Sequence, residues 1–405
     1  MNLSQLTLKN YRNYENAILN FNNKINIIIG DNAQGKTNIL EAIYFLAITK
    51  SYRTSDDVNL IRTGTFQSVV SAKAKINGMS KKISITFNKN TKKIVFNNNP
   101  VKKLSEFIGV LKIVLMAPED IDIIKGSPSI RRNFLNIELS KMSKDYINKY
   151  NEYNKLLKMR NDYLKLLMTN NIADHRYLDI ITDKLIDRAV YIYRKRFEFL
   201  CKINYYLDSI YDNITFGRKL KIVYEPNIDI KLFDDENIKK SLKYKYDSNL
   251  NKEMSLGMTI YGPHRDDFLF LIDDKNIEFF GSQGQQKLAV IALKLSIVYV
   301  LNELTNEMPI LLLDDIFSEV DKKKKNKILE YIKNIGQVVI TTNDIKDINK
   351  NKLDDVKIIK IKNQKITEKG GKNGRYSLWF VLNTSFRGLR SCKKKARYVH
   401  WYNRC

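Results

Sequence analysis

The sequence predicts an α/β fold into which a long helical segment is inserted. Strand-like and helix-like stretches alternate over about the first 135 residues and again after residue 256. Between these parts, residues 129–225 contain no proline, and their only glycine is Gly217. Because proline and glycine interrupt helices, this composition favours long helices in the middle of the chain.

Near the N-terminus, a glycine-rich loop lies between a predicted strand and a predicted helix. The apolar, β-branched run at residues 25–29 is typical of a buried strand, and residues 38–47 carry apolar side chains at helical spacing. Both neighbours argue against a chance glycine-rich turn. Further strands are expected at residues 3–8, 73–76, 82–87 and 94–96, with turns at residues 77–78 and 97–100.

The loop itself has the composition of a phosphate-binding loop. Gly30 and Gly35 let backbone N–H groups close around phosphate oxygens, and the helix N-terminus adds a positive potential. Lys36 is expected to reach the β- and γ-phosphates as a catalytic cation, and the Thr37 hydroxyl to bind Mg²⁺. The predicted nucleotide-binding residues are Gly30, Asp31, Asn32, Ala33, Gln34, Gly35, Lys36 and Thr37.

The inserted segment carries apolar residues at seven-residue spacing. Such spacing predicts two long helices packed as an antiparallel hairpin, with the chain reversal at residues 169–171. An ordinary helical bundle with the same period is the alternative. The heptad positions are Tyr146 and Tyr153; Tyr150, Leu157 and Leu164; and Leu178, Leu185, Ile192, Phe199 and Tyr206.

A second apolar strand, at residues 310–313, ends in Asp314 and Asp315. The first carboxylate is expected to join the Mg²⁺ shell. The second is expected to orient or deprotonate the attacking water. Two solvated acids after a strand are common, but a complete phosphate loop elsewhere in the chain favours the catalytic interpretation. The surrounding elements are predicted as helices at residues 285–304 and 322–334 and a strand at residues 338–342.

A second anion-binding element is predicted at residues 282–287, just before a helix. Ser282 offers a hydroxyl and Gly284 a backbone N–H near the positive helix end, followed by Gln285. Since the chain already has one phosphate loop, a second element suggests that two chains share each nucleotide. Alone, this segment would be only a capped helix start.

Charge and cysteine content limit the classes of function that the chain can have. Lys and Arg number 70 against 44 Asp and Glu, a net charge of +26, which suggests a polyanionic partner such as nucleic acid, although general lysine enrichment would have the same effect. Three scattered cysteines argue against a disulfide scaffold or a zinc site. Without a signal pattern or an uninterrupted apolar span, a cytoplasmic protein without membrane contact is expected.

The motifs occur in the order Walker A, ABC signature, Walker B and D-loop, and they resemble the ABC/SMC-like ATPases. The resemblance sharpens to the RecF family of bacterial recombination mediators. The supporting blocks, several of them specific to that family, are residues 9–14, 117–120, 126–128 with Arg131 and Arg132, and 262–267; the D-loop is residues 318–321. The resemblance covers roughly residues 1–366, and the acid-free tail after Glu368 has no counterpart in it.

The resemblance implies an ABC-type ATPase head with an inserted, coiled-coil-like second lobe. The implied division is residues 1–135 and 251–366 for the head, 136–250 for the arm, and 367–405 for a basic tail outside the fold. It further implies an ATP- and Mg²⁺-dependent homodimer, with ATP between one chain's Lys36 loop and the other's Ser282, Gly284 and Gln285. Asp315, where most ABC proteins have glutamate, suggests slow hydrolysis.

The implied function is weak, DNA-stimulated ATP hydrolysis that works as a switch in DNA repair, recombination, replication and the SOS response. The dimer would bind single-stranded DNA and gap junctions and help RecR and RecO to load RecA. Further nucleotide or DNA contacts are suggested at Arg12, Asn13, Lys50, Arg53, Glu119, Asp120 and Thr342, and a structural turn at His264, Arg265 and Asp266.

Three alternatives remain at this point. A transporter subunit would need neither the arm nor the charge, and its signature is usually Leu-Ser-Gly-Gly-Gln. A structural SMC protein is nearer, but its coiled coil is far longer than this arm. An ATPase that regulates a nuclease would be recognised by a stable nuclease partner.

Overall fold

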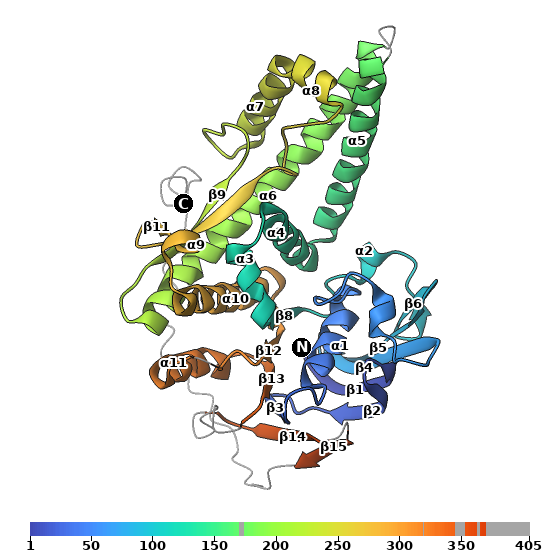
Figure 1. Cartoon of the computed structure of the whole chain (residues 1–405), viewed down its shortest axis with the longest axis vertical. Helices are drawn as coiled ribbons and strands as arrows, with labels where there is room; N and C mark the ends of the chain where they lie inside the picture. The colour runs from blue at the N-terminus through green and yellow to red at the C-terminus, as the bar shows by residue number, and fades with distance from the viewer. Residues whose placement is uncertain (170–173, 319, 345–352, 363–364, 370–405) are drawn as a thin grey trace.

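The computed structural model describes residues 1–169, 174–318, 320–344, 353–362 and 365–369. It has a head built around two sheets and an elongated helical arm that rises from it (Figure 1). This arrangement confirms the predicted α/β fold with an inserted helical lobe.

The central sheet of the head has the strand order β15-β14-β3-β13-β12-β8. Its strands are parallel except for β15, and several are buried along their whole length, as parallel strands covered on both faces must be. The parallel strands β3, β12 and β13 end at one edge, where the predicted site residues lie. The strands are β3 Ile25–Ile29, β8 Ile113–Met116, β12 Ile310–Asp314, β13 Gln337–Thr342, β14 Val356–Lys362 and β15 Lys365–Lys369.

An antiparallel sheet with the order β2-β1-β4-β5-β6-β7 forms the other layer of the head. One face packs on α1 (Lys36–Ile48), which is buried between the two sheets, and the other face is open to solvent (Figure 1). The predicted strands here are all present and longer than expected. They are β1 Asn2–Tyr11, β2 Tyr14–Asn20, β4 Gln67–Ile76, β5 Met79–Asn88, β6 Lys92–Phe96 and β7 Asn99–Pro100.

The arm is built on α5 (Lys144–Thr169) and α6 (His175–Thr215), which pack against each other. The heptad residues Leu178, Leu185, Ile192 and Phe199 are buried, which confirms the two-helix prediction. The rest of the predicted reversal after Thr169 lies outside the described residues. Nearer the head, α6 packs on α10 (Gln283–Thr305).

The arm also contains elements that the sequence did not predict. Helix α7 packs on α6 and α8 on α5, and a small sheet has the order β11-β10-β9. The predicted boundary after residue 250 therefore falls at the start of α8. The elements are α7 Asp235–Ser248, α8 Leu250–Leu256, β9 Leu220–Glu225, β10 Asp267–Ile272 and β11 Lys275–Asn276.

Short elements and two longer helices, α4 and α11, complete the fold. The remaining bounds are η1 Asp57–Leu60, α2 Leu104–Phe107, η2 Pro118–Ile121, α3 Asp122–Lys125, α4 Pro128–Met142, α9 Ile277–Phe280 and α11 Lys322–Lys333. Among the described helices, α10 is long and apolar enough to cross a bilayer, but most of it is buried inside the protein, as expected for a core helix.

The start of the predicted tail needs correction. Residues 367–369 belong to β15, which pairs with β14, and Glu368 forms an ion pair with Lys357. The fold therefore continues past residue 366, because residues 365–369 form a strand that pairs antiparallel with β14. Residues 370–405 lie outside the described part of the chain.

Candidate nucleotide-binding site

Three strand ends converge on one cleft of about 240 Å³. Because β3, β12 and β13 run parallel, the residues that follow them meet at the same edge of the sheet. The helix α1 begins there with its N-terminus facing the cleft. The lining residues are Asn32, Ala33, Gly35, Lys36, Thr37, Asn38, Arg53, Asp314, Asp315, Thr341 and Asn343.

The two predicted loop glycines are required by close packing. Gly35 has φ +94°, and a Cβ there would lie within 2.6–2.9 Å of side-chain atoms of Asn13 and Tyr14. A Cβ on Gly30 would lie 2.6 Å from the backbone oxygen of Ile361. The observed loop conformation therefore requires glycine at both positions. Asp31, Asn32 and Ala33 are exposed at the loop tip, while Gln34 and Thr37 are half-buried.

The Lys36 ammonium group is positioned by hydrogen bonds to three oxygen atoms. Its Nζ donates to the backbone oxygens of Gly30 (2.6 Å) and Asp31 (2.8 Å) and to Oδ1 of Asn343 (2.8 Å). Burial lowers the pKa of Lys36, and the carboxylates of Asp315 and Asp314 oppose that shift. The ammonium group is thus fixed at the cleft by acceptors that phosphate oxygens can replace.

Asp314 and Thr37 form an oxygen-rich pair at the base of the cleft. The Thr37 hydroxyl donates to Oδ1 of Asp314 (3.1 Å), and Asp314 also accepts from Thr341 Oγ1 (2.6 Å) and the Tyr52 hydroxyl (3.3 Å). Burial, and secondly the charge of Asp314, raises the pKa of Tyr52, so Tyr52 stays a donor. Hydroxyl and carboxylate oxygens are the ligands that Mg²⁺ prefers, so these residues fit that ion.

Asp315 lies beside this pair in an unusual backbone conformation. Its φ of +47° places it in the left-handed region, and its backbone N–H donates to Thr341 Oγ1 (3.1 Å). Asp315 lines the cleft with Asp314, whereas its backbone oxygen accepts from Ser318 Oγ (2.9 Å). The predicted second acid thus borders the space open to a nucleotide.

The signature residues lie outside this cleft. Ser282 caps α10, and its backbone N–H donates to Oε1 of Gln285 (2.8 Å) while its hydroxyl accepts from the Gln285 N–H (3.3 Å). Gly284 faces open space, with no atom within 4 Å of a Cβ built on it. Lys287 reaches from α10 to the backbone oxygen of Ser318 (2.6 Å). The next D-loop residue, Glu319, is outside the described residues.

Arg12 and Arg53 approach the cleft through Glu41, which is fully buried on α1. Arg12 makes a two-pronged ion pair with Glu41 (2.7 and 2.9 Å). Arg53 lines the cleft and donates to Asn38 Oδ1 (3.1 Å), with Glu41 at 4.0 Å and Glu119 at 3.9 Å.

The other residues predicted to contact the nucleotide or DNA differ in how close they lie to the cleft. Asn13 reaches the cleft through Asn38, whose Nδ2 donates to Asn13 Oδ1 (2.9 Å). Lys50 is exposed and does not line the cleft. Asp120 faces α10 instead, where it pairs with Lys294 (2.6 Å). Thr342 is buried and its hydroxyl donates to the backbone oxygen of Asp344 (3.0 Å).

The segment at residues 262–267 is a buried structural turn that packs on α5 and α6 within the arm. Arg196 of α6 donates to both carboxylate oxygens of Asp266 (2.5 and 2.6 Å) and to the backbone oxygen of Pro263 (2.5 Å). Nδ1 of His264 lies 2.6 Å from the Tyr153 hydroxyl, whereas Arg265 is exposed. The predicted turn with an ion pair is therefore present for Asp266.

Sequence reasoning missed Asn343, Thr341 and Tyr52. The prediction placed the residue at the end of β13 on Thr342, but successive strand side chains point to opposite faces. Thr341 and Asn343 therefore point to the cleft and Thr342 does not. Strand alternation measured from Asp314 across β12 and β13 could have found them; Tyr52 follows a loop whose path the sequence does not specify.

Comparison with known proteins adds to this geometry. Residues 2–368 match the RecF/RecN/SMC N terminal domain family. A protein of Bacillus cereus (strain G9842) named DNA replication and repair protein RecF is 40% identical over 365 residues, which cover 90% of this chain and 97% of the relative.

Solved structures agree with that match. A structure of the recombination mediator protein RecF with ATP has a TM-score of 0.83 at 32% identity, covering 91% of this chain and 97% of that one. An Smc head bound to a winged helix domain of ScpA has a TM-score of 0.55 at 15% identity, covering 91% of this chain and 98% of that one. The latter likeness concerns the fold.

Proposed function

Because this chain belongs to the RecF/RecN/SMC family and RecF proteins match it almost end to end, we propose that it is an ATP-controlled DNA-binding protein of recombinational repair. The observation that carries the proposal is the cleft itself, where Lys36, Thr37 and Asp314 meet at the edge of the sheet. Chains of this family are ATPases, and the cleft supplies the groups that ATP hydrolysis requires.

Different residues of the cleft are proposed to bind the phosphates and the Mg²⁺ ion of the nucleotide. The backbone N–H groups of residues 30–37 surround the phosphates, and Lys36 exchanges its present oxygen partners for phosphate oxygens. Thr37 and Asp314 hold Mg²⁺, which when bound neutralises charge on the β- and γ-phosphates. Gly35 fits this role because its missing Cβ is what lets the loop pack against Asn13 and Tyr14.

Asp315 is the group proposed to orient and deprotonate water. It lines the cleft next to Asp314, at the end of a strand whose position is fixed by its neighbours on both sides. Its side chain is one methylene shorter than that of glutamate, which is consistent with slow turnover suited to a switch.

Two copies of the chain are proposed to share each nucleotide. Ser282 and Gly284 are exposed beside an open helix end, outside their own chain's cleft. They are therefore free to close the γ-phosphate side of a partner's cleft, with the helix N-terminus contributing positive potential. ATP then joins the dimer and hydrolysis releases it.

DNA is the proposed partner of that dimer, at single-strand/double-strand junctions of gaps. The net charge of +26 supports binding to phosphates. A cytoplasmic place, RecR and RecO as partners, and help in loading RecA complete the proposal. The relatives support this assignment over a structural SMC protein, which resembles the chain only in fold; no observation favours a nuclease regulator.

A direct test is fluorescence anisotropy of labelled gapped DNA with wild-type protein and Lys36→Ala, in ATP and in ADP. The proposal expects tight, salt-sensitive binding by the wild type in ATP and weak binding in the other three cases. Binding that is independent of both nucleotide and salt would contradict it.

A further inference from the structure

The solvent-facing side of the antiparallel sheet, named here the outer face, carries lysines at neighbouring positions. Burial alternates along β4, so that Lys73 and Lys75 point to solvent while Ala72, Ala74 and Ile76 point to α1. In β5, Lys82 lies directly opposite Lys73. The five exposed lysines of this face are Lys9, Lys73, Lys75, Lys82 and Lys93.

In the described part of the chain, no carboxylate forms an ion pair with these five lysines. The strands β1, β4, β5 and β6 contain no Asp or Glu, although acids make up 44 of the 405 residues. Across the described part of the chain, none of the five lysine side chains forms an ion pair or a hydrogen bond. The remaining strands of the sheet hold one acid, Glu15 of β2, which pairs with Arg62 (3.4 Å) and not with these lysines.

Fold stability does not explain the pattern. Like charges directly opposite each other in an antiparallel pair are destabilising, with Cβ atoms about 4.5–5.5 Å apart. Lys73 and Lys82 form such a pair. By contrast, Lys92 points inward, where its Nζ donates to the backbone oxygen of Thr49 (2.7 Å). An anion bound on the outer face would relieve this repulsion.

The other outer positions suit a nucleic-acid backbone. Ser71 lies opposite Ser84, and Thr86 lies opposite Lys93, so hydroxyl groups alternate with the lysines. Hydroxyl and ammonium groups are common donors to phosphate oxygens. Lys9 and Lys93 lie in one cross-strand row, three strand spacings apart, or about 14 Å.

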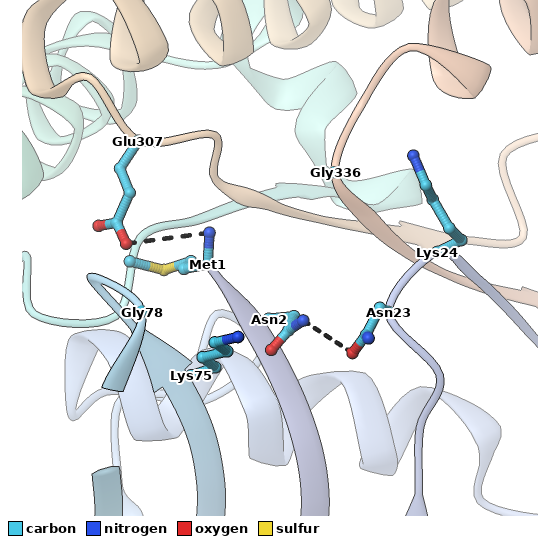
Figure 2. A pocket seen from close by; sticks show the side chains of 8 residues that line it. All are labelled: Met1, Asn2, Asn23, Lys24, Lys75, Gly78, Glu307 and Gly336. Atoms are coloured by element: carbon cyan, nitrogen blue, oxygen red, sulfur yellow. Dashed lines mark hydrogen bonds and ion pairs between the residues drawn. The ribbon is translucent and has the colours of Figure 1, made fainter. Parts of the chain in front are cut away.

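A pocket of about 280 Å³ extends the outer face at the end of β4. Lys75 of β4 and Lys24, which immediately precedes β3, lie on its two sides, with the Asn2–Asn23 hydrogen bond (2.7 Å) between them (Figure 2). The only acid of the lining, Glu307, is already paired with Lys112 (3.2 Å) and the Met1 amino group (3.9 Å). The pocket therefore continues the positive face.

We propose that the outer face, from Lys9 and Lys93 to the pocket at Lys24 and Lys75, binds the phosphate backbone of DNA. This inference rests on the proposed function, since it names the surface by which the chain holds the DNA assigned to it. Binding is through charge and hydroxyl groups, so it is independent of base sequence and weakens steeply with salt.

The test compares Lys73→Gln/Lys82→Gln with Lys240→Gln/Lys243→Gln, a matched pair of exposed lysines on α7 at the far end of the arm (Figure 1). Anisotropy of labelled gapped duplex DNA is measured with ATP over a salt series. The outer-face variant should bind about tenfold more weakly or worse, with a salt slope shallower by about 2. The control should bind as the wild type does, and neither variant should melt at a lower temperature, because removal of a like-charged pair does not destabilise the sheet.

Equal affinities and slopes for the wild type and Lys73→Gln/Lys82→Gln would overturn the inference while leaving the proposed function intact. The same loss in the control would also overturn it, since the effect would then be one of net charge. Absence of DNA binding by the wild type would instead remove the proposed function. Lys24→Gln/Lys75→Gln, tested in parallel, should lose affinity if the pocket belongs to the surface.

Discussion

Oδ1 of Asn343 lies 2.8 Å from Nζ of Lys36, which joins the end of β13 to the phosphate-binding loop. The two residues are 307 positions apart in sequence. The contact puts a neutral acceptor where the phosphates are proposed to lie, so that Lys36 is positioned without being neutralised by a fixed carboxylate.

Asn343→Asp should weaken ATP binding about tenfold or more, because the new carboxylate pairs with Lys36 and repels the phosphates. Asn343→Ala should bind ATP as well as the wild type, since it removes only a competing acceptor. Titration with a fluorescent ATP analogue measures both. Wild-type affinity in the Asp variant would show that Asn343 does not face the phosphates.

The Thr37–Asp314 pair predicts that a change at Asp314 removes the effect of Mg²⁺ on ATP binding and hydrolysis without removing ATP binding itself. Asp314→Asn should abolish the gain in ATP affinity and hydrolysis that Mg²⁺ gives the wild type, while binding without Mg²⁺ stays within about twofold. Thr37→Ser keeps the hydroxyl and serves as the control. Calorimetric titrations with and without Mg²⁺ decide, and a normal Mg²⁺ response in Asp314→Asn would place the metal elsewhere.

The buried Arg196–Asp266 pair predicts a large loss of stability. Asp266→Asn leaves the Arg196 charge buried without its partner and should cost about 3–5 kcal/mol of unfolding free energy. Glu152→Gln breaks the exposed Arg188–Glu152 pair of the same arm and should cost less than about 1 kcal/mol. Urea unfolding monitored by circular dichroism compares them. Equal costs would mean that burial does not decide the value of these ion pairs.

His264 predicts a pH dependence of stability. Burial, with the nearby Arg265, Arg132 and Arg196 charges, lowers the pKa of His264 from 6.5 to about 4. The unfolded chain therefore binds a proton between pH 6.5 and 4 that the folded chain does not, so stability present above pH 6.5 falls as pH falls to 4, by about 3 kcal/mol.

His264→Gln should make the melting temperature less dependent on pH between 6.5 and 4. Each protein's melting temperature is expressed relative to its own value at pH 7.5, so that a difference in overall stability does not enter the comparison. The exposed Lys240→Gln change on α7 is the control and should leave the dependence nearly unchanged. An identical pH profile in wild type and His264→Gln would show that His264 does not stay neutral in the fold.

The sequence was most informative at the phosphate-binding loop and the strand-end acid, where the chemistry of binding phosphate and Mg²⁺ requires particular residue types. Gly35, Lys36, Thr37 and Asp314 could be placed because strand, loop and helix patterns around them fix which ends meet. Helices α5 and α6 followed from apolar spacing alone. Small elements such as α7 and α8 were missed, since their apolar faces are formed only by packing on the arm.

Contacts between distant segments were the least predictable part of the site. Asn343 and Thr342 are adjacent, and only the register of β13 against β12 decides which of them faces Lys36. Asp120 was expected near the nucleotide, yet its ion pair with Lys294 directs it to α10. Such choices depend on tertiary geometry that local patterns do not contain.

The central claim, that two chains share ATP through Lys36 and Ser282, is tested most directly by sedimentation velocity. Wild-type protein, Lys36→Ala and Ser282→Arg are compared with ATP and with ADP, with and without gapped DNA. The account predicts dimers only for the wild type in ATP, tightened by DNA, while Ser282→Arg still binds ATP as a monomer. Monomers under every condition, or dimers of Ser282→Arg in ATP, would contradict it.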